Sequence, residues 1–375
     1  MGQRRREVEN VVIDRAFWCG KRVFLTGHTG FKGAWMTLLL HSLGADVFGF
    51  ALPPEHEGGV FNVAGVVGDC VNQYGDINDP AALVAAMVQC QPDVVLHLAA
   101  QALVRRSYAR PAETWMTNVM GTVHLLEAVR RVAGIRAVVI VSSDKCYENV
   151  GRARGYDESD ALGGADPYSA SKAGTELVAA SYRRSYLVDA AGPQLASARA
   201  GNVIGGGDWA ADRLVPDAMR AFQSGEALHI RNPASVRPWQ HVLDPVLGYL
   251  RLAERLAGGD GSVSEAWNFG PRSGSEVSVG EIAENLVQRW GGTARWNRDT
   301  AEDHPHEAAY LRLDCAKANA RLGWHPALSL QPSLDLTVDW YRLYADGAAM
   351  RDVTLAQIDR VLKLATAQAS QLKIK

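Results

Sequence analysis

The sequence predicts an α/β protein built on a doubly wound parallel sheet. Short apolar strands alternate with helices through the first 200 residues, an order that favours a parallel sheet with helices on both faces. The strands are continuous apolar runs, which is typical of strands buried on both sides. The chain has 375 residues, of which 47% are apolar and 21% charged, so it has room for this domain and a smaller one.

The expected elements follow from local patterns along the chain. Each short apolar run ends at a turn or polar cluster: a glycine turn after the first strand, a Ser-Ser-Asp cluster after the fourth, and Arg199 after the last. The expected strands are 21–25, 46–50, 92–98, 137–141 and 195–198. The expected helices are 33–43, one that includes 83–88, 111–132, 167–187 and an amphipathic helix at 352–373. Residues 1–20 are expected to form a loose leader.

The pattern becomes irregular beyond about residue 200, where glycines and prolines interrupt it. We therefore expect a Rossmann-like domain over 18–200, with 236–270 returning to it. Residues 201–235 and 271–350 are expected to form a smaller, mixed α/β lobe. Residues 351–375 are expected to add a C-terminal helix, whose expected role is to pack against the rest of the protein.

Composition excludes several classes of protein. The net charge of -2 argues against non-specific binding to nucleic acid or to an anionic membrane surface. The five cysteines are widely spaced and form no CxxC pair, so neither a disulfide framework nor a zinc site follows, and a reducing cytoplasm fits. No run of about 18 apolar residues indicates a membrane-spanning helix. No metal site is expected, since His304 and His306 lack carboxylate support.

A glycine-rich turn joins the first strand to the first helix. Its glycines let the backbone turn tightly and approach a pyrophosphate, and the helix N-terminus offers free N–H groups to the anion. The spacing is GxxGxxG, and a glycine turn that binds nothing is the alternative. The candidate cofactor-binding residues here are Gly27, His28, Thr29, Gly30, Phe31, Lys32 and Gly33.

Further cofactor contacts are expected at later strand ends. The second strand ends at Phe50-Ala51-Leu52, with neither carboxylate nor arginine, so this point does not choose between NAD and NADP. Asp76 and Ile77 are placed to flank the adenine, although a polar loop start explains them equally well. Small residues after the 92–98 strand let a cofactor lie against the backbone. This set is Leu98, Ala99, Ala100 and Gln101, with Asn118 added from the following helix.

Tyr168 and Lys172 stand four residues apart, which places both on one face of the expected helix. A lysine ammonium beside a phenol lowers the pKa of the phenol, and an oxidised nicotinamide adds to this effect. The phenolate can then take a hydroxyl proton while hydride leaves the carbon. The alternative is a chance surface pair, because YxxxK is common.

A polar cluster follows the 137–141 strand. Ser143 can share the hydroxyl hydrogen bond with Tyr168. An elimination needs one group to deprotonate carbon and another to protonate the leaving hydroxyl, and Asp144 and Lys145 can divide those tasks if the lysine is partly neutral. A polar turn with a simple salt bridge is the alternative.

Together these residues resemble the extended short-chain dehydrogenase/reductase family, and within it the CDP-glucose 4,6-dehydratases. The resemblance spans nearly the whole chain in the family's order. The glycine turn and YxxxK mark only the superfamily, whereas several of the later segments are more specific. The segments are 26–35 (TGHTGFKGAW), 142–149 (SSDKCYEN), 163–173 (GGADPYSASKA), 198–210 (ARAGNVIGGGDWA), 237–245 (RPWQHVLDP), 267–271 (WNFGP) and 304–315 (HPHEAAYLRLDC).

The resemblance implies a redox-neutral elimination with NAD as cofactor. Hydride leaves sugar C4, a base removes the C5 proton, water leaves from C6, and the hydride returns to C6. Tyr168 would be the C4-hydroxyl base, Lys172 its activator and Ser143 its partner. Asp144 looks like the acid for the C6 hydroxyl. Lys145 stands where many related dehydratases carry glutamate, which leaves the C5 base open.

Substrate contacts are proposed on the same basis, with a nucleotide sugar as the partner molecule. Guanidinium groups suit phosphate oxygens, although surface or interdomain salt bridges explain each arginine as well. The candidates are Asn202, Arg213, Arg231, Arg237, Trp239, His241, His306 and Glu307. The loop after Asn149 lacks the tryptophans that the family resemblance leads us to expect, and Ala165 stands where a histidine is expected. These departures from the family pattern concern the identity of the substrate more than the chemistry.

Other hypotheses remain in competition. A 4-epimerase, or a dehydratase for another nucleotide sugar, would use the same Tyr168 and Lys172 pair, but an epimerase needs neither Asp144 nor Lys145. A silent NAD-binding protein predicts loss of catalytic residues that are present. The resemblance further implies a cytoplasmic enzyme of deoxysugar and O-antigen or polysaccharide biosynthesis. It also implies a homodimer through the 111–132 and 167–187 helices, whose interior packing is the alternative.

Overall fold

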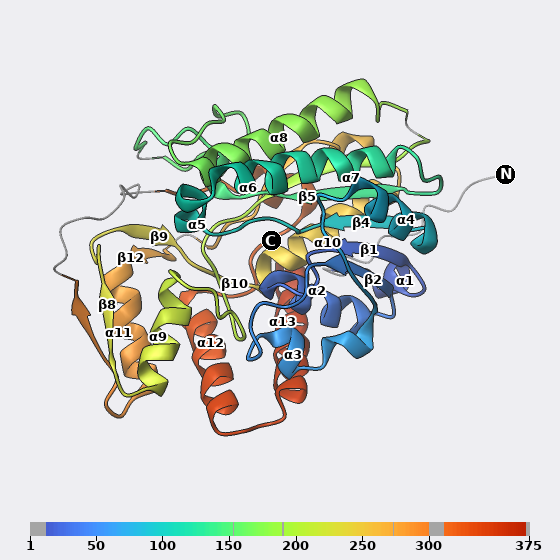
Figure 1. The fold of residues 1–375 in the computed structure, drawn as a ribbon. Helices are drawn as coiled ribbons and strands as arrows, with labels where there is room; N and C mark the ends of the chain where they lie inside the picture. The colour runs from blue at the N-terminus through green and yellow to red at the C-terminus, as the bar shows by residue number, and fades with distance from the viewer. Residues whose placement is uncertain (1–12, 153, 190, 273, 300–310, 373–375) are drawn as a thin grey trace.

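A computed structural model describes residues 13–152, 154–189, 191–272, 274–299 and 311–372. Its centre is a seven-stranded sheet with the order β11-β6-β5-β4-β1-β2-β3, in which every pair of neighbours is parallel. The strands are β1 (Arg22–Thr26), β2 (Asp46–Ala51), β3 (Val71–Tyr74), β4 (Val94–His97), β5 (Ala137–Val141), β6 (Gln194–Arg199) and β11 (Ala266–Asn268). The predicted doubly wound fold is confirmed (Figure 1).

Both faces of this sheet are buried, and alternate residues of one strand enter different cores. On β4, Val94 and Leu96 join the larger core, whereas Val95 joins the smaller one. On β5 the same division separates Val139 from Val138. Two apolar layers explain why these strands are continuous apolar runs in the sequence.

Helices cover the two faces as separate groups (Figure 1). One group contains α4 (Pro80–Cys90), α7 (Gly121–Val129) and α8 (Pro167–Ser185), and it packs on the smaller core. The opposite group contains α2 (Phe31–Ser42), α10 (Leu243–Ala257) and α12 (Leu330–Ala345), with α13 (Met350–Leu372) against α12 and α2. Shorter helical segments are α3 (Val60–Val63), α5 (Val104–Ala109), η1 (Val66–Asp69), η3 (Asp144–Cys146), η4 (Gly261–Val263) and η5 (Ala318–Leu322).

The structure differs from the sequence prediction in several places, and strand β11 is one of the elements that were not expected. The described end of the expected leader is packed: α1 (Arg15–Trp18) is capped by Asp14, and the Trp18 indole donates to Glu254 at 2.7 Å. Strand β3 was not predicted, because its residues are polar or half exposed. The expected 111–132 helix is α6 (Pro111–Trp115), a π-helical turn η2 (Met116–Met120) and α7.

Three two-stranded sheets, all formed by residues after β6, lie apart from the central sheet. Their strands are β7 (Val203–Ile204), β8 (Ala227–Ile230), β9 (Val236–Pro238), β10 (Gln240–His241), β12 (Glu276–Ser278) and β13 (Arg295–Arg298). β7 pairs with β10, β9 with β12 and β8 with β13. Helices α9 (Leu214–Gln223) and α11 (Val279–Trp290) accompany these strands, and we call this group the substrate lobe after the role that the sequence predicts (Figure 1). Its strands β9 and β10 fall in the 236–270 stretch that was expected to return to the Rossmann-like domain.

Candidate active site

A cleft of about 1340 Å³ opens at the carboxyl ends of β1, β4 and β5. The substrate lobe contributes the opposite wall, including residues of β7, α9 and β8. Ligands of doubly wound sheets bind at this edge, where the strand order reverses between β1 and β4. The volume exceeds the range of about 300–1,000 Å³ that is usual for one small ligand, so the cleft has room for two.

The glycine turn is shaped by close backbone approaches. Gly27 has φ +77°, and a Cβ there would lie 2.7 Å from the Ala99 nitrogen. A Cβ on Gly33 would lie 2.1 Å from the Gly27 oxygen. The N-cap residue of α2 is Gly30, which has no side chain that could accept a hydrogen bond from the first N–H groups of the helix. These N–H groups belong to residues that line the cleft. The turn thus keeps an anion site free at the N-terminus of α2.

Most of the expected cofactor contacts line this cleft. They are Gly27, Thr29, Gly30, Phe31, Lys32, Gly33, Asp76, Ile77, Leu98, Ala99, Ala100 and Gln101, together with Tyr168 and Lys172. The Thr29 hydroxyl donates to the Leu52 carbonyl at 2.8 Å and holds the turn against the end of β2. These positions leave one continuous trough from Asp76 to Tyr168.

Three expected contacts have other places in the structure. The His28 ring is buried behind the turn, where its Nε2 lies 2.6 Å from the Asn72 Oδ1. Asn118 is buried in η2 and holds the backbone of Gln101, accepting from its nitrogen at 2.8 Å and donating to its oxygen at 3.1 Å. His241 is buried edge-on against Trp35. None of the three lines the cleft, because each points into the core beneath it.

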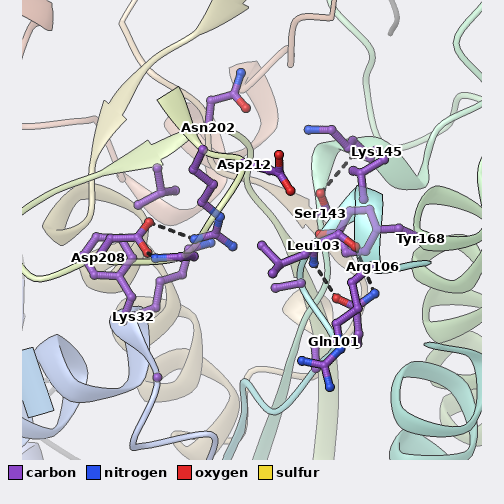
Figure 2. Close-up of a pocket in the computed structure, with 18 of the residues that line it drawn as sticks. Lys32, Gln101, Leu103, Arg106, Ser143, Lys145, Tyr168, Asn202, Asp208 and Asp212 are labelled. Carbon is purple, nitrogen blue, oxygen red and sulfur yellow. Dashed lines mark hydrogen bonds and ion pairs between the residues drawn. The ribbon is translucent and has the colours of Figure 1, made fainter. Parts of the chain in front are cut away.

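The catalytic candidates meet on one wall of the cleft. Tyr168 projects from the first turn of α8, which Asp166 caps, and Ser143 and Asp144 follow β5 (Figure 2). The Ser143 hydroxyl donates to the Asp144 Oδ1 at 3.0 Å, and it lies near enough to Tyr168 to oppose the rise in the pKa of that phenol. The Lys145 Nζ lies 3.8 Å from the same carboxylate oxygen, with 30% of its side chain exposed. The structure therefore places these four catalytic candidates on the same wall.

The pKa of Tyr168 differs from the sequence expectation. Burial raises it to about 12, and the hydrogen bond from Ser143 is the largest opposing effect. The Lys172 Nζ lies 3.5 Å from the Val141 carbonyl, and burial lowers the pKa of this lysine to about 8. In the protein alone, desolvation of the phenolate outweighs the charges around it, and a lowering of the Tyr168 pKa by Lys172 stays a prediction.

Behind this wall lies a buried network that the sequence analysis missed. Glu176, one turn beyond Lys172 on α8, accepts from Ser142 and, at 2.9 Å, from the Arg199 guanidinium. Glu176 also accepts from the Ser197 hydroxyl at 2.6 Å, and Arg199 donates to the Tyr147 hydroxyl at 2.7 Å. Arg199 and these hydrogen bonds hold the pKa of Glu176 below its usual value despite its burial. The network ties α8 to the ends of β5 and β6.

The substrate lobe carries the other polar wall. Arg213 pairs with Asp208 at 2.9 Å, and Figure 2 places Lys32 on the same side of the cleft as Asp208. Burial lowers the pKa of Lys32 to about 7, with the positive charges of Arg213 and Lys172 adding to the effect. Asp208 was missed, although it follows the Gly205–Gly207 run that marks the lobe's first turn.

The remaining substrate candidates divide into two groups. Those that line the cleft are Asn202, Arg213, Arg231, Arg237 and Trp239. Asn202 has φ +37°, and its buried Nδ2 has no partner within the described residues. An unpaired buried donor is costly unless something accepts from it, so this amide is ready for a ligand oxygen. His306 and Glu307 lie outside the described residues.

In the described part of the chain, no helix is long and apolar enough to cross a membrane. No cluster of three or more His, Cys, Asp or Glu side chains that could hold a metal ion occurs there.

Comparison with known proteins places the chain among sugar-nucleotide dehydratases. The family model described as GDP-mannose 4,6 dehydratase matches residues 24–336. The chain belongs to this family. A CDP-glucose 4,6-dehydratase of Salmonella typhimurium is 49% identical over 343 residues, which cover 90% of this chain and 95% of that protein. A dTDP-glucose 4,6-dehydratase of Streptomyces antibioticus is 32% identical, with coverage of 72% and 75%.

Solved structures of the family have the same architecture. A dTDP-glucose 4,6-dehydratase from Streptomyces venezuelae, crystallised with NAD, superposes with a TM-score of 0.74 at 28% identity and covers 87% of this chain and 98% of its own. A UDP-glucose 4-epimerase from Thermotoga maritima, solved with UDP-glucose, gives 0.73 at 25% identity, with coverage of 86% and 99%. The fold is thus shared by dehydratases and epimerases, and side chains must decide between the two reactions.

Proposed function

We propose that the chain is an NAD-dependent hydro-lyase that converts CDP-glucose to CDP-4-keto-6-deoxyglucose. The observation that carries this proposal is the meeting of Asp144 and Lys145 with Ser143 and Tyr168 in one cleft. Identity of 49% to a CDP-glucose 4,6-dehydratase over 90% of the chain supports the same substrate. Because the product is a deoxysugar, the reaction belongs to deoxysugar biosynthesis.

The glycine turn fits a dinucleotide. Gly27 and Gly33 leave space that any Cβ would fill, and the uncapped N-terminus of α2 suits a pyrophosphate. Ala99 and Ala100 would lie against the nicotinamide half, and Asp76 and Ile77 near the adenosine. When bound, NAD supplies the redox chemistry, accepting hydride from sugar C4 and returning it to C6, and its oxidised ring carries a positive charge that favours the phenolate.

The side chains of the wall then divide the proton transfers. Tyr168 takes the proton of the C4 hydroxyl, with Ser143 near the phenol and Lys172 one helical turn further along α8. The resulting C4 ketone acidifies the C5 proton. Asp144 gives its proton to the C6 hydroxyl, which leaves as water, and Lys145 is our candidate for the C5 base. Burial of Tyr168 and Asp144 keeps bulk water from these steps.

The substrate lobe would hold the nucleotide sugar. Arg213, Arg231 and Arg237 supply guanidinium groups for the diphosphate, and Asn202 offers an unpaired amide donor. Trp239 lines the same wall. We propose the boundaries given above for the two parts, with residues 18–200 and 236–270 around the cofactor and residues 201–235 and 271–350 around the substrate.

A homodimer and a cytoplasmic location are part of the same proposal. Apolar side chains on α6, η2 and α8 are unusually exposed: Trp115 by 42%, Met116 by 47%, and Leu177 by 61%. Exposed apolar groups on adjacent helices favour burial against a second copy. We also keep the assignment to O-antigen or polysaccharide synthesis as an expectation from the resemblance.

The test is substrate conversion by the purified protein. CDP-glucose, UDP-glucose, GDP-glucose and dTDP-glucose are incubated separately, with and without added NAD, and products are analysed by mass. We expect loss of one water from CDP-glucose. Water loss from only one of the other nucleotide sugars would show that the reaction is a dehydration but that its substrate is not CDP-glucose. Loss from none, with NAD bound and the fold intact, would favour the epimerase alternative, which needs neither Asp144 nor Lys145.

A further inference from the structure

The buried histidine His97 lies beneath the cleft and has no part in the proton transfers proposed above. It is the last residue of β4, and only 2% of its surface is exposed. Its Nδ1 lies 2.7 Å from the Thr26 hydroxyl oxygen, and its Nε2 lies 3.2 Å from the Thr122 hydroxyl oxygen. Either atom of each pair can be the donor, so the direction of both bonds follows from the other partners of the two hydroxyls.

The Thr26 hydroxyl fixes the bond at Nδ1. Its oxygen accepts from the backbone nitrogens of Leu98 and Ala99, each at 3.2 Å. A hydroxyl has two acceptor positions and one hydrogen. Because both acceptor positions are filled, the hydroxyl hydrogen is left for the His97 Nδ1, which must therefore carry no hydrogen itself.

The Thr122 hydroxyl fixes the bond at Nε2. It donates to the Asn118 carbonyl at 2.7 Å, and a carbonyl oxygen can only accept. The Thr122 oxygen must then accept from the His97 Nε2, which carries the hydrogen of the ring. The two ends agree on one neutral tautomer, and burial accordingly lowers the pKa of His97 to about 3.

The same line of hydrogen bonds continues to the catalytic helix α8. The Asn118 side chain donates to the Ser171 hydroxyl at 2.8 Å, and this hydroxyl donates to the Tyr168 carbonyl at 2.7 Å. Every side chain that makes this line is at most 2% exposed. Since a fully satisfied buried network has one arrangement of donors and acceptors, it holds its ends rigidly. Those ends are the backbone of Leu98 and Ala99 and the backbone of Tyr168.

We propose that His97, as the tautomer with its hydrogen on Nε2, is a positioning residue that sets the cofactor side of the cleft relative to Tyr168. This inference rests on the proposed function. Leu98 and Ala99 line the cleft, and a Cβ on Gly27 of the glycine turn would lie 2.7 Å from the Ala99 nitrogen. Hydride transfer needs the sugar held between the cofactor and Tyr168, and an error of about 1 Å in such an arrangement costs roughly 100-fold in rate.

Two threonines allow a matched test. Thr122 and Thr337 are both buried in helices, and each hydroxyl donates at 2.7 Å to the carbonyl four residues earlier. Thr122 in addition accepts from His97, whereas Thr337 lies on α12 and does not line the cleft. Thr122→Val and Thr337→Val therefore remove the same local bond, and the first also removes the acceptor of the His97 Nε2. Thr122→Ser keeps the hydroxyl and serves as the rescue.

The first measurement uses the unaltered protein without substrate. NMR of the protein with isotope-labelled histidine reports which ring nitrogen carries hydrogen, and the His97 signal is assigned by its change in Thr122→Val. We expect hydrogen on Nε2 alone, with no titration between about pH 6 and about pH 8, where an ordinary histidine changes charge. Hydrogen on Nδ1, or a titration in that range, would overturn the proposal.

The second measurement compares the kinetics of CDP-glucose with and without deuterium at C4. We expect Thr122→Val to lower kcat about tenfold and to raise the deuterium isotope effect, with KM nearly unchanged, because hydride transfer alone is slowed. Thr122→Ser and Thr337→Val should keep the wild-type values. An alanine pair at the same two positions replaces the valine pair if Thr122→Val does not fold. Equal kcat and isotope effects in the two matched variants would overturn the positioning role. No water loss in the wild type would instead overturn the proposed function.

Discussion

The central sheet and the substrate lobe are built in different ways. In the sheet, each strand is a local apolar run, and its catalytic or cofactor residues follow at the carboxyl end. In the lobe, strands meet partners far along the chain, as β13 (Arg295–Arg298) does with β8 (Ala227–Ile230). The sheet fixes the groups that we propose for the chemistry, and the lobe presents the groups that we propose for substrate selection.

This division predicts that substitutions in the two regions have different kinetic signatures. Those beside β5 and α8 should lower kcat or stability, whereas those in the lobe should raise KM. The following predictions test that contrast, from the largest expected effect to the smallest.

Tyr168→Phe should have the largest effect on catalysis. The change removes the group that accepts the C4 hydroxyl proton and retains the ring, so kcat should fall by about 10²–10⁴-fold with little change in KM. Steady-state kinetics with CDP-glucose measure both constants, and NAD binding serves as the control for an intact site. A kcat within a few-fold of wild type would contradict the assignment of Tyr168 as the base.

Glu176→Gln should strongly lower the free energy of unfolding of the protein. The change leaves the Arg199 guanidinium buried without its carboxylate, and breaking one side of a buried ion pair costs about 3–5 kcal/mol. Chemical denaturation measures the loss. The double variant Glu176→Gln with Arg199→Met should regain much of it, because the uncompensated charge is gone. Equal stability of the single and double variants would show that the pair is not the origin of the effect.

Arg213→Ala should act on substrate binding. Loss of a guanidinium from a phosphate site costs about 1.5–3 kcal/mol, so KM for CDP-glucose should rise roughly 10- to 100-fold while kcat changes less. Arg360→Ala, on the exposed face of α13, is the matched control and should leave both constants unchanged. A fall in kcat without a rise in KM would indicate that Arg213 acts in the chemical steps. That result would contradict the proposed division between catalytic groups at the sheet and substrate-binding groups in the lobe.

Lys32 should make NAD binding depend on pH. Its pKa is lowered to about 7 by burial and by Arg213 and Lys172, while Asp144 and Asp208 oppose the shift. The ammonium that attracts a pyrophosphate is present below this pKa and lost above it, so the Kd for NAD should rise above pH 7, by at most about tenfold per pH unit. Calorimetric titration from pH 6 to 9 measures this. Lys32→Met should remove the dependence; an unchanged slope would exclude Lys32 as its source.

The parts that could be predicted from sequence are those with a local physical basis. Apolar runs located β4 and β5, and the four-residue spacing placed Tyr168 and Lys172 on one helix face, which the structure confirms. Strand β3 could not be found this way because its burial is incomplete. The lobe's paired strands depend on distant partners, which no local pattern reveals.

Side-chain direction was the other source of error. His28 lies inside the glycine turn in sequence, yet its ring packs over Gly49, where a Cβ would lie 2.3 Å from the imidazole. Asn118 lies in the π-helical turn η2, and its side chain accepts from the Gln101 backbone. The fully buried network of Glu176 and Arg199 had no signal in spacing alone, since it joins residues from separate elements.

The most direct test of the account is the fate of the hydrogen on C4. CDP-glucose carrying deuterium at C4 is converted by the NAD-loaded protein, and the product is examined by NMR and mass spectrometry. The account predicts loss of one water and transfer of the deuterium to the C6 methyl group of the same molecule. Deuterium retained at C4, with no water lost, would contradict a dehydratase and indicate an epimerase.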